Sequence, residues 1–494
     1  MYGERIKMEL FNLLEMGIPV FGKTYEVSLD WIGNLIRILC GAVGSVGVGI
    51  ILFSILLKLV TLPFDIYQRI SMRKQNLQME ANKEKMEKLQ KQYANDKEKY
   101  NQKVMEMYKE NGISMFSSCL PMILSLIIFI VAINSFNAFA QYSNIENYNT
   151  MVNAYNAEIG SYCAVLTDEN VEDCLTIEGK TLDDKGNPLQ QQEVTYTVKN
   201  ADKPIYYKAY EVLPQGVEYT TLTKAEKVSY VNSYVNKEYF VDVDKVKADT
   251  ALMTEINAQK QEGEEDAQAI YNYFVSRAQD SVVEAYKTDV KANMSFGWIK
   301  NIWATDASYK HPVLSYSDFK AEASREKFEV NGKNVSYSSI SSYTNAYGED
   351  QYNLVTAKLS AQKKEANGFF ILIALSIGTI LLQQFVTQRS QKAQSQYSSV
   401  DGQAASQQKM TMIIMTGMFA IFSFMYSSAF SIYMITSNLF SLGSTLIINK
   451  IVDVKMAKKA SETELKRYEN HAADRIEKAK NAGKASAQET KNKK

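Results

Sequence analysis

Four long stretches of this 494-residue chain contain no charged residue. These runs of 20, 35, 23 and 40 residues lie between Arg37 and Lys58, Glu110 and Glu146, Glu365 and Arg389, and Lys409 and Lys450. A helix needs roughly 20 apolar residues to cross a bilayer, so the last run can hold two helices joined by a turn. The pattern therefore predicts an all-α polytopic membrane protein with five transmembrane helices.

The segments between the spans have different periodicities. Residues 65–113 contain two runs with apolar side chains at helical spacing, interrupted by the turn-forming "ANDK" at 94–97, which predicts a helical hairpin. Residues 136–365 combine helical spacing with strand-like alternation such as "EVTYTV", which predicts a mixed α/β or α+β insertion. We expect residues 355–365 to run straight into the third span.

Lysine and arginine near the spans predict the orientation. Residues 65–113 hold 11 basic and 8 acidic residues, residues 450–494 hold 13 and 7, and residues 135–365 hold 23 and 34. Because basic loops remain in the cytoplasm, the first two segments are predicted to be cytoplasmic and the third extracytoplasmic. We therefore expect a multi-pass protein of the bacterial plasma membrane, with its N-terminus outside and its C-terminus in the cytoplasm.

These inferences divide the chain into ten parts. In chain order they are an extracytoplasmic N-terminal segment with an interfacial helix (1–40), the first span (41–64), a cytoplasmic helical hairpin (65–113), the second span (114–135), an extracytoplasmic insertion (136–365), the third span (366–388), a cytoplasmic loop (389–409), the fourth span (410–427), the fifth span (429–450) and a basic cytoplasmic tail (451–494).

The stretch "GIPVFGKT" at residues 17–24 fits the phosphate-binding loop of nucleotide hydrolases. Such a loop needs a strand before it and a helix directly after it. Here the following residues place Leu29, Ile32, Ile36 and Leu39 on one helical face, which is typical of a helix lying on a membrane. We therefore expect no nucleotide site at this stretch. Because the chain has only two histidines and no Cys/His cluster, we also expect no metal, no cofactor and no enzymatic activity.

Polar residues inside the spans are the strongest candidates for function. Lys58 lies in an apolar stretch, where a charge is costly and usually faces a bundle interior or a water-filled cavity. The alternative is that its side chain extends to the cytoplasmic interface. Later spans carry further polar residues that could line a wet groove with Lys58, although serine and threonine often bond only to their own helix. These include Gln383, Ser431, Thr436, Ser437 and Asn438.

The insertion offers two further features. Cys163 and Cys174 could pair in an oxidising compartment, which the sequence leaves open. Residues 135–365 also hold 21 of the 31 tyrosines, which indicates either a binding surface or ordinary packing.

Three blocks make the chain resemble the YidC-type membrane protein insertases of the Oxa/YidC/Alb superfamily. They are "IILFSILLKLVTLPF" with the following hairpin and "YKENGISMFSSCLP", "FGWIKNIWATDAS" at 296–308, and "SIYMITSNLFSLGSTLIINK" at 431–450. Departures remain, since Ser427, Ala429 and Met434 stand where the family tends to have Pro, Gly and Trp. The large insertion after the second span also has no counterpart in the familiar outer domain, which follows the first span.

The resemblance implies an insertase and membrane chaperone that moves newly made membrane proteins into the bilayer through a hydrophilic groove, without nucleotide hydrolysis. Lys58 would be the family's basic groove residue, Gln383 its polar position on the third span, and Tyr433, Thr436, Ser437 and Asn438 part of its last-span motif. The implied partners are nascent membrane proteins, the ribosome and targeting factors, with the Sec translocon and anionic lipid as further candidates.

The hairpin is expected to receive the incoming chain or its delivery machinery, through positions such as Gln90, Tyr93, Lys97 and Tyr108. A passive spacer is the alternative. For the whole protein, the alternatives are a receptor or scaffold acting through the tyrosine-rich outer domain and a small-solute transporter. A transporter should show internal repeats and broken helices, and neither is evident in the sequence.

Overall fold

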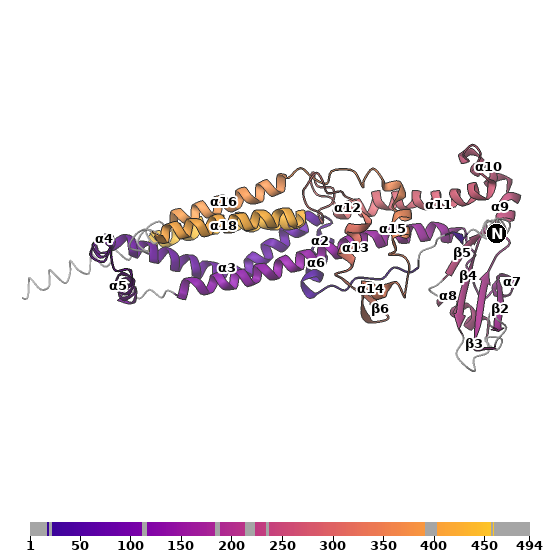
Figure 1. Cartoon of the computed structure of the whole chain (residues 1–494), viewed down its shortest axis with the longest axis horizontal. Helices are drawn as coiled ribbons and strands as arrows, with labels where there is room; N and C mark the ends of the chain where they lie inside the picture. The colour runs from indigo at the N-terminus through magenta and orange to yellow at the C-terminus, as the bar shows by residue number, and fades with distance from the viewer. Residues whose placement is uncertain are drawn as a thin grey trace, which may run out of the picture. The chain divides into compact units, whose positions relative to one another are not determined.

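The structure is a computed structural model that describes residues 17–18, 22–110, 116–182, 188–212, 223–233, 237–390, 403–455 and 458 (Figure 1). The first 16 residues, part of the predicted 389–409 loop and most of the predicted 451–494 tail lie outside the described residues. The chain divides into two compact units. The first comprises Met1–Ile50, Asn134–Ile371 and Phe424–Ala429, and the second comprises Ile51–Ile133, Leu372–Ser423 and Phe430–Lys494.

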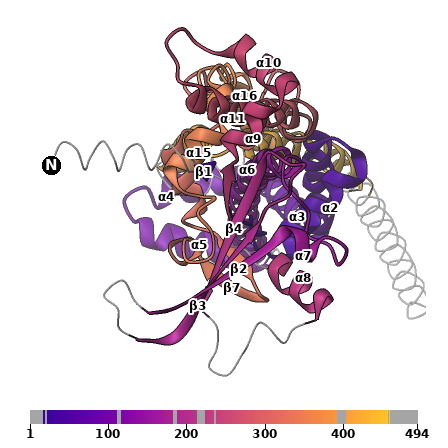
Figure 2. The same ribbon diagram turned by 90° about the vertical axis from the view of Figure 1, so that its right-hand side faces the viewer.

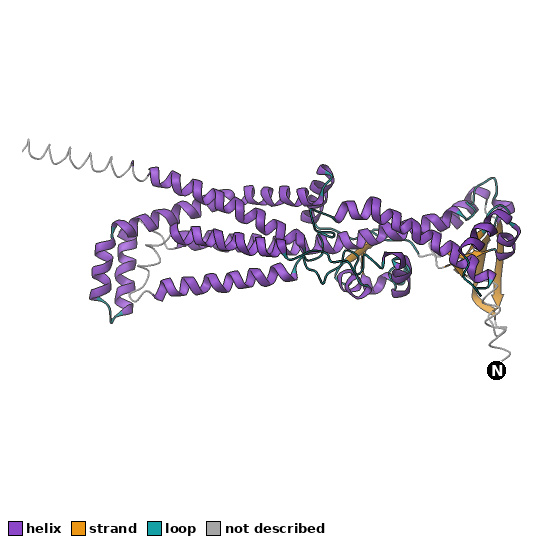
Figure 3. Ribbon diagram, turned by 90° about the horizontal axis from the view of Figure 1, so that it is seen from above, coloured by secondary structure: helices purple, strands orange, loops and turns teal. Residues whose placement is uncertain are grey.

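Long helices build the second unit. They are α3 (Val46–Ala81), residues 116–133 of α6 (Phe116–Ser161), α16 (Ile371–Ser390), α18 (Gln403–Met425) and a last helix, Ser428–Lys455. In the described part of the chain, three helices are long and apolar enough to cross a membrane: Val46–Arg73, Ile371–Arg389 and Ser428–Lys455. Two shorter apolar helices are Trp31–Val43 and Thr416–Met425. The apolar helices indicate a membrane protein, and Figure 3 shows that its described part is mostly helical with some sheet.

The outer faces of these helices are apolar. Val60 of α3, Leu381 of α16 and Ile413 of α18 are 63%, 51% and 72% exposed. Inside the bundle, the rings of Phe129 and Phe419 pack edge to face with centroids 5.2 Å apart. Apolar side chains that face outward are unfavourable in water and favourable in lipid, so this exposure pattern supports a membrane-embedded unit.

Two short helices, α4 (Lys83–Gln92) and α5 (Lys97–Glu110), pack against each other across the predicted "ANDK" turn. Their small core consists of the buried residues Met86, Tyr100 and Val104, flanked by partly buried Leu89, Tyr93 and Met107. Helix α3 does not end at the predicted boundary after residue 64 but continues to Ala81. The helix pair therefore begins about five turns later than the apolar pattern predicts.

A five-stranded antiparallel sheet lies in the first unit. Its strands are β1 (Gly17–Ile18), β2 (Leu175–Leu182), β3 (Pro188–Val198), β4 (Ile205–Val212) and β5 (Lys237–Val241), in the order β1-β5-β4-β3-β2. Figure 2 shows β2, β3 and β4 side by side. Alternation along β3 places Val194, Tyr196 and Val198 in a core with Cys174 and Val231. The mixed α/β character expected of the insertion is thus present.

Helices make up most of the remaining first unit. They are α2 (Trp31–Val43), α7 (Val171–Cys174), α8 (Lys224–Ser233), α9 (Val243–Ala248), α10 (Thr250–Gln259), α11 (Asp266–Ala285), η2 (Tyr286–Val290), α12 (Lys291–Met294), α13 (Tyr316–Ala323), α14 (Tyr337–Ile340), α15 (Glu349–Val355) and η3 (Ala357–Leu359), with a hairpin of β6 (Lys327–Val330) and β7 (Lys333–Ser336). The predicted amphipathic helix is α2: Asp30 caps it by accepting from the Gly33 amide at 2.6 Å, Ile32 and Ile36 are buried, and Trp31 is exposed.

Many tyrosines of the insertion are core residues. Tyr148, Tyr352 and Phe319 are buried and meet with ring centroids 4.8 Å apart in each pair. The Tyr148 hydroxyl donates to the Ala346 carbonyl at 2.7 Å, and the Tyr352 hydroxyl donates to the Leu314 carbonyl at 2.8 Å. Because each hydroxyl has a buried acceptor, these side chains pack as amphipathic core residues. Ordinary packing is the correct interpretation for them.

The expectation that residues 355–365 run straight into the third span is wrong. Helix α15 ends at Val355, a single 3₁₀ turn follows at Ala357–Leu359, and α16 begins only at Ile371. The Asn367 side-chain amide donates to the carbonyls of Asn301 and Thr305, both at 2.9 Å. These bonds hold the segment in an irregular conformation that a continuous helix would not allow.

The region of "GIPVFGKT" does not have the architecture of a phosphate-binding loop. Its first two residues form the short strand β1, residues 19–21 lie outside the described part, and the next helix begins only at Trp31. The Gly22 amide donates to the Asn345 side-chain oxygen at 3.1 Å, and the Thr24 hydroxyl donates to that of Asn153 at 3.0 Å. These two donors are thus engaged within the first unit.

Candidate functional site

One face of α3 carries a polar stripe inside the second unit. Ser54, Lys58, Thr61, Asp65 and Arg69 recur every three to four residues, which is the spacing of one helical face. Ser54, Thr61 and Asp65 are all less than 9% exposed. The opposite face carries the exposed Leu59, Val60 and Phe64. Helix α3 is therefore amphipathic, but its polar face points into the bundle and its apolar face points outward, which is the reverse of a helix on the surface of a water-soluble protein.

Two other helices of this unit carry matching polar residues. Helix α16 contributes Ser376, Thr379, Gln383 and Thr387, and the last helix contributes Ser431, Ser437, Asn438, Ser441, Thr445 and Asn449. The Asn438 side-chain amide lies 3.4 Å from the Thr379 hydroxyl, and the hydroxyls of Ser376 and Ser423 lie 3.0 Å apart. The bundle interior is consequently polar along several turns.

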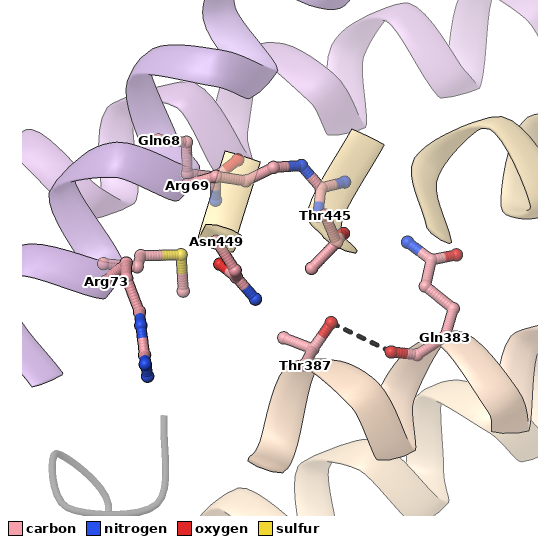
Figure 4. A pocket seen from close by; sticks show the side chains of 8 residues that line it. Gln68, Arg69, Arg73, Gln383, Thr387, Thr445 and Asn449 are labelled. Atoms are coloured by element: carbon pink, nitrogen blue, oxygen red, sulfur yellow. Dashed lines mark hydrogen bonds between the residues drawn. The ribbon is translucent and has the colours of Figure 1, made fainter. Parts of the chain in front are cut away.

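A cavity of about 170 Å³ lies between α3, α16 and the last helix (Figure 4). Its lining residues are Gln68, Arg69, Met72, Arg73, Gln383, Thr387, Thr445 and Asn449. Figure 4 shows the Arg69 side chain extending from α3 toward Thr445. Since a site of roughly 15 Å³ with polar partners can hold one water, this cavity can hold several. It is large enough and polar enough to be wet.

The charges of α3 are unequally paired. The Arg73 guanidinium binds the Asp453 carboxylate through Nε–Oδ1 at 2.7 Å and Nη2–Oδ2 at 2.9 Å. Lys58 Nζ lies 3.9 Å from Asp65 Oδ2, with the two side chains 19% and 12% exposed. The buried Nε of Arg69 has no hydrogen-bond partner among the described residues. Arg69 therefore presents an unused donor at the wall of the cavity.

The predicted groove residues are distributed along this interior. Gln383 lines the cavity. Lys58 lies two turns before Asp65 on the same face of α3 and does not line the cavity. On the last helix, Ser431, Tyr433 and Ser437 are buried, and Thr436 is half-buried. The Ser431 hydroxyl has no hydrogen-bond partner in the described structure, and Asn438 faces Thr379 of α16.

Sequence reasoning missed Asp65, Arg69, Thr445 and Asn449. It treated residue 64 as the end of the first span, so the polar stripe beyond Lys58 was assigned to the hairpin. The spacing 54, 58, 61, 65 and 69 is a detectable signal, because it keeps one polar face inward over four turns. Thr445 and Asn449 continue the spacing from Asn438 and Ser441 in the same way.

The other predicted residues lie outside this cavity. In the helix pair, Tyr93 packs beside the small core, Gln90 is half-buried and Lys97 is exposed, while the Tyr108 side chain lies outside the described part. Cys163 and Cys174 are buried free thiols in the structure and do not form the disulfide that their spacing left open. Burial raises the pKa of the Cys163 thiol to about 12, which keeps it protonated and unreactive at neutral pH.

Comparison with known proteins identifies a family. The model of the 60Kd inner membrane protein family matches residues 38–166 and 334–457, which together are just over half of the chain. Both ranges exclude most of the insertion, including the 296–308 block. They include the whole of α3, α16 and the last helix, and hence the whole cavity lining. No solved structure matches the chain.

Curated relatives point the same way. The chain is 38% identical over 98 residues to the membrane protein insertase YidC of Caldanaerobacter subterraneus subsp. tengcongensis, covering 20% of this chain and 46% of the relative. It is 33% identical over 102 residues to that of Fusobacterium nucleatum subsp. nucleatum, covering 21% and 48%. The chain thus spans about half the length of these relatives. The resemblance to YidC-type insertases is confirmed, and the chain belongs to the 60Kd inner membrane protein family.

Proposed function

We propose that this protein is a membrane insertase and chaperone that moves newly made membrane proteins into the bilayer without nucleotide hydrolysis. The observation that carries the proposal is the polar, arginine-containing cavity between α3, α16 and the last helix, inside a unit whose outer faces are apolar. Polar groups inside the membrane cost free energy, and a bundle that only anchors a protein has no need of them.

The mechanism follows from hydration. A polar segment that crosses lipid must leave its backbone groups unsatisfied, at a cost of several kcal/mol for each group. The interior of this unit offers alternative partners: Gln383, Thr445 and Asn449 at the cavity, and Ser431, Thr436, Ser437 and Asn438 along the last helix. Once the polar segment has entered this polar interior, the apolar span of the substrate moves into lipid, and the burial of that span drives insertion.

Charge adds selectivity to this path. Lys58 and Arg69 lie on the inward face of α3 and suit acidic residues of a short segment that is being translocated. Lys58 acts as a compact point charge, whereas the planar Arg69 guanidinium can bind a carboxylate through two donors. Buried Tyr433, beside Ser437 on the last helix, bounds the same interior.

The proposed topology has five spans, with the second in α6 and the fourth in α18. The N-terminus and the insertion are outside, while the α4–α5 pair and the C-terminal tail are in the cytoplasm, in accordance with the positive-inside rule. We propose that the α4–α5 pair, through Gln90, Tyr93, Lys97 and Tyr108, receives nascent membrane proteins from the ribosome and targeting factors. The lysine-rich tail suits ribosomal RNA or anionic lipid, and the Sec translocon is a further candidate partner.

Reconstitution tests the proposal. The purified full-length protein is placed in vesicles without nucleotide, and a single-span substrate with a short acidic tail is added. Protection of the tail from external protease reports insertion, and empty vesicles serve as the control. Protection that depends on the protein and persists after apyrase treatment supports an insertase. Insertion that is equal to that in empty vesicles contradicts the proposal.

A further inference from the structure

Asp65 lies between two cations on the inward face of α3. Its carboxylate is 3.9 Å from Lys58 Nζ, seven residues earlier, and interacts electrostatically with Arg69, four residues later. At 1.5 Å per residue, the three side chains span about 16 Å along the helix axis. Asp65 itself is 8% exposed. The inward face of α3 therefore carries its own buried carboxylate.

The Lys58–Asp65 contact differs from the neighbouring ion pair. Arg73 and Asp453 share two hydrogen bonds of 2.7 and 2.9 Å, the length expected of charge-assisted bonds. At 3.9 Å, Lys58 and Asp65 are attracted by charge but are too far apart to share a hydrogen bond. Both charged groups are largely removed from water, and away from water their attraction is strong. At this distance neither charge is fully compensated by the other. Such a pair can exchange partners readily.

Arg69 provides the alternative partner. It follows Asp65 by one helical turn, and its buried Nε has no hydrogen-bond partner among the described residues. An acidic group that reaches Lys58 would therefore leave Asp65 beside a second cation with a free donor. The total charge of the stripe is +1, so it can accept one further negative charge without an unpaired carboxylate.

We propose that Asp65 is an internal competitor for the acidic residues of an inserting chain. This inference rests on the proposed function and concerns its selectivity. Without substrate, Asp65 is paired with Lys58. A carboxylate of the incoming segment displaces it, and Asp65 then pairs with Arg69. The competitor weakens binding of acidic segments and so permits their release, while neutral segments do not experience it. Asp65 is thus a specificity-determining residue of the groove.

Peptide binding to the full-length protein in phosphatidylcholine nanodiscs tests the inference. The probe is a fluorescent ten-residue peptide with three glutamates, and its control carries glutamine at the same positions. Asp65→Asn should lower the dissociation constant for the glutamate peptide by about tenfold and leave that for the glutamine peptide unchanged. Glu178→Gln, which removes an exposed carboxylate of β2, should change neither. Wild-type affinity or weaker binding of the glutamate peptide by Asp65→Asn overturns the inference.

A double variant covers the case in which Asp65→Asn does not fold. Lys58→Gln combined with Asp65→Asn removes the two charges of this pair together, so that neither Lys58 nor Asp65 is left buried without the other. Compared with Lys58→Gln alone, the double variant should bind the glutamate peptide more tightly, because Arg69 is no longer occupied by Asp65. Equal or weaker binding by the double variant contradicts the competitor role.

The same measurements separate this inference from the proposed function. If the wild-type protein binds the glutamate and glutamine peptides equally, the charged groove itself is wrong and the inference fails with it. If the wild type prefers the glutamate peptide, but neither the removal of Asp65 alone nor its removal with Lys58 tightens binding, only the competitor role fails.

Discussion

Arg73 of α3 and Asp453 of the last helix form a two-pronged ion pair, although 380 residues separate them in the chain. Their side chains are 19% and 44% exposed, and Arg73 also lines the cavity. Parallel bonds between a guanidinium and a carboxylate fix direction as well as distance. The pair therefore holds the first and last long apolar helices of the second unit in one arrangement at the cavity wall.

A charge swap tests this pair. Arg73→Glu should destabilise the unit by about 1–2 kcal/mol, because it places two carboxylates together at a partly buried site. Asp453→Arg should do the same, and the double variant should recover at least half of the loss. Thermal unfolding in detergent measures these effects, with Lys83→Glu on the exposed surface of α4 as the control. Purely additive losses in the double variant would show that the two side chains are not coupled.

Lys58 should act through its charge. Lys58→Arg is expected to retain most insertion of a substrate with an acidic tail, whereas Lys58→Ala should lower it several-fold and Lys58→Glu more strongly. The alanine variant also leaves the Asp65 carboxylate without its nearest cation. The readout is the rate of tail protection in vesicles, compared with that of a substrate whose tail is neutral. If Lys58→Ala inserted the acidic substrate at an unchanged rate, a role of the Lys58 charge in insertion would be excluded.

The α4–α5 pair should be required for activity and not for folding of the membrane unit. Its small core of Met86, Tyr100 and Val104 is self-contained, so replacement of residues 80–104 by a Gly-Ser linker should leave the apolar helices connected and folded. We expect this variant to lose most insertion activity in a coupled translation assay. In the protein with its natural α4–α5 pair, cross-links from Gln90 or Lys97 to the nascent chain should appear only during translation. Full activity of the linker variant would establish that the pair is a spacer.

Glu322 should make the insertion sensitive to pH. Burial raises the pKa of its carboxyl from 4.5 to about 7, partly opposed by the 2.8 Å hydrogen bond that Asn144 donates and by Lys310 and Arg325; Asp318 adds to the increase. The folded state therefore binds more protons than the unfolded state between these two values, so stability falls as pH rises from about 4.5 to about 7.

Glu322→Gln tests this dependence, because its amide oxygen can still accept from Asn144. Relative to this variant, the wild type should lose on the order of 1 kcal/mol of stability between pH 5 and pH 8. Hydrogen exchange of the amides in α13 measures the difference. Parallel pH profiles for the two proteins would show that Glu322 does not titrate in this range.

Lys23 should have no role in nucleotide binding. Its ammonium lies over the Tyr25 ring, 5.8 Å from the centroid, and the neighbouring Gly22 and Thr24 donate to Asn345 and Asn153. Lys23→Ala is therefore expected to leave insertion unchanged, and neither protein should bind fluorescent ATP or GTP analogues. Saturable nucleotide binding that the substitution abolishes would reverse this interpretation of "GIPVFGKT".

Periodicity alone predicted the elements whose environment is uniform. Among the described residues, three of the long uncharged runs overlap the helices that are apolar enough to cross a membrane, Val46–Arg73, Ile371–Arg389 and Ser428–Lys455, since each surface of such a helix meets lipid or packed side chains. Tyr148, Val152, Tyr155 and Ile159 are all buried, as their spacing predicts, because they repeat on one face of α6. The turn between α4 and α5 is likewise local, and asparagine and aspartate favour it through their own side-chain bonding.

Long-range pairing lay beyond the sequence. The strand Gly17–Ile18 joins β5 more than 200 residues later, and the register Gly17↔Phe240 leaves no mark on either segment. Residues 355–365 were predicted to be continuous with the third span, but the Asn367 side chain donates to the carbonyls of Asn301 and Thr305, which lie more than 60 residues earlier in the chain. Which tyrosines are buried depended on acceptors such as the Ala346 carbonyl, supplied by distant segments.

The same division applies to the candidate site. From the sequence alone, Lys58 and the polar residues of the last helix are predicted to lie in apolar helices, where their cost makes them candidates for function. Which of these residues meet is visible only in the folded protein. Arg69, Gln383, Thr445 and Asn449 surround one cavity, Arg73 binds Asp453, and Asp65 lies 3.9 Å from Lys58. Helical spacing determines the face on which a side chain lies, whereas its partners depend on how separate helices pack, and that is a property of the folded bundle.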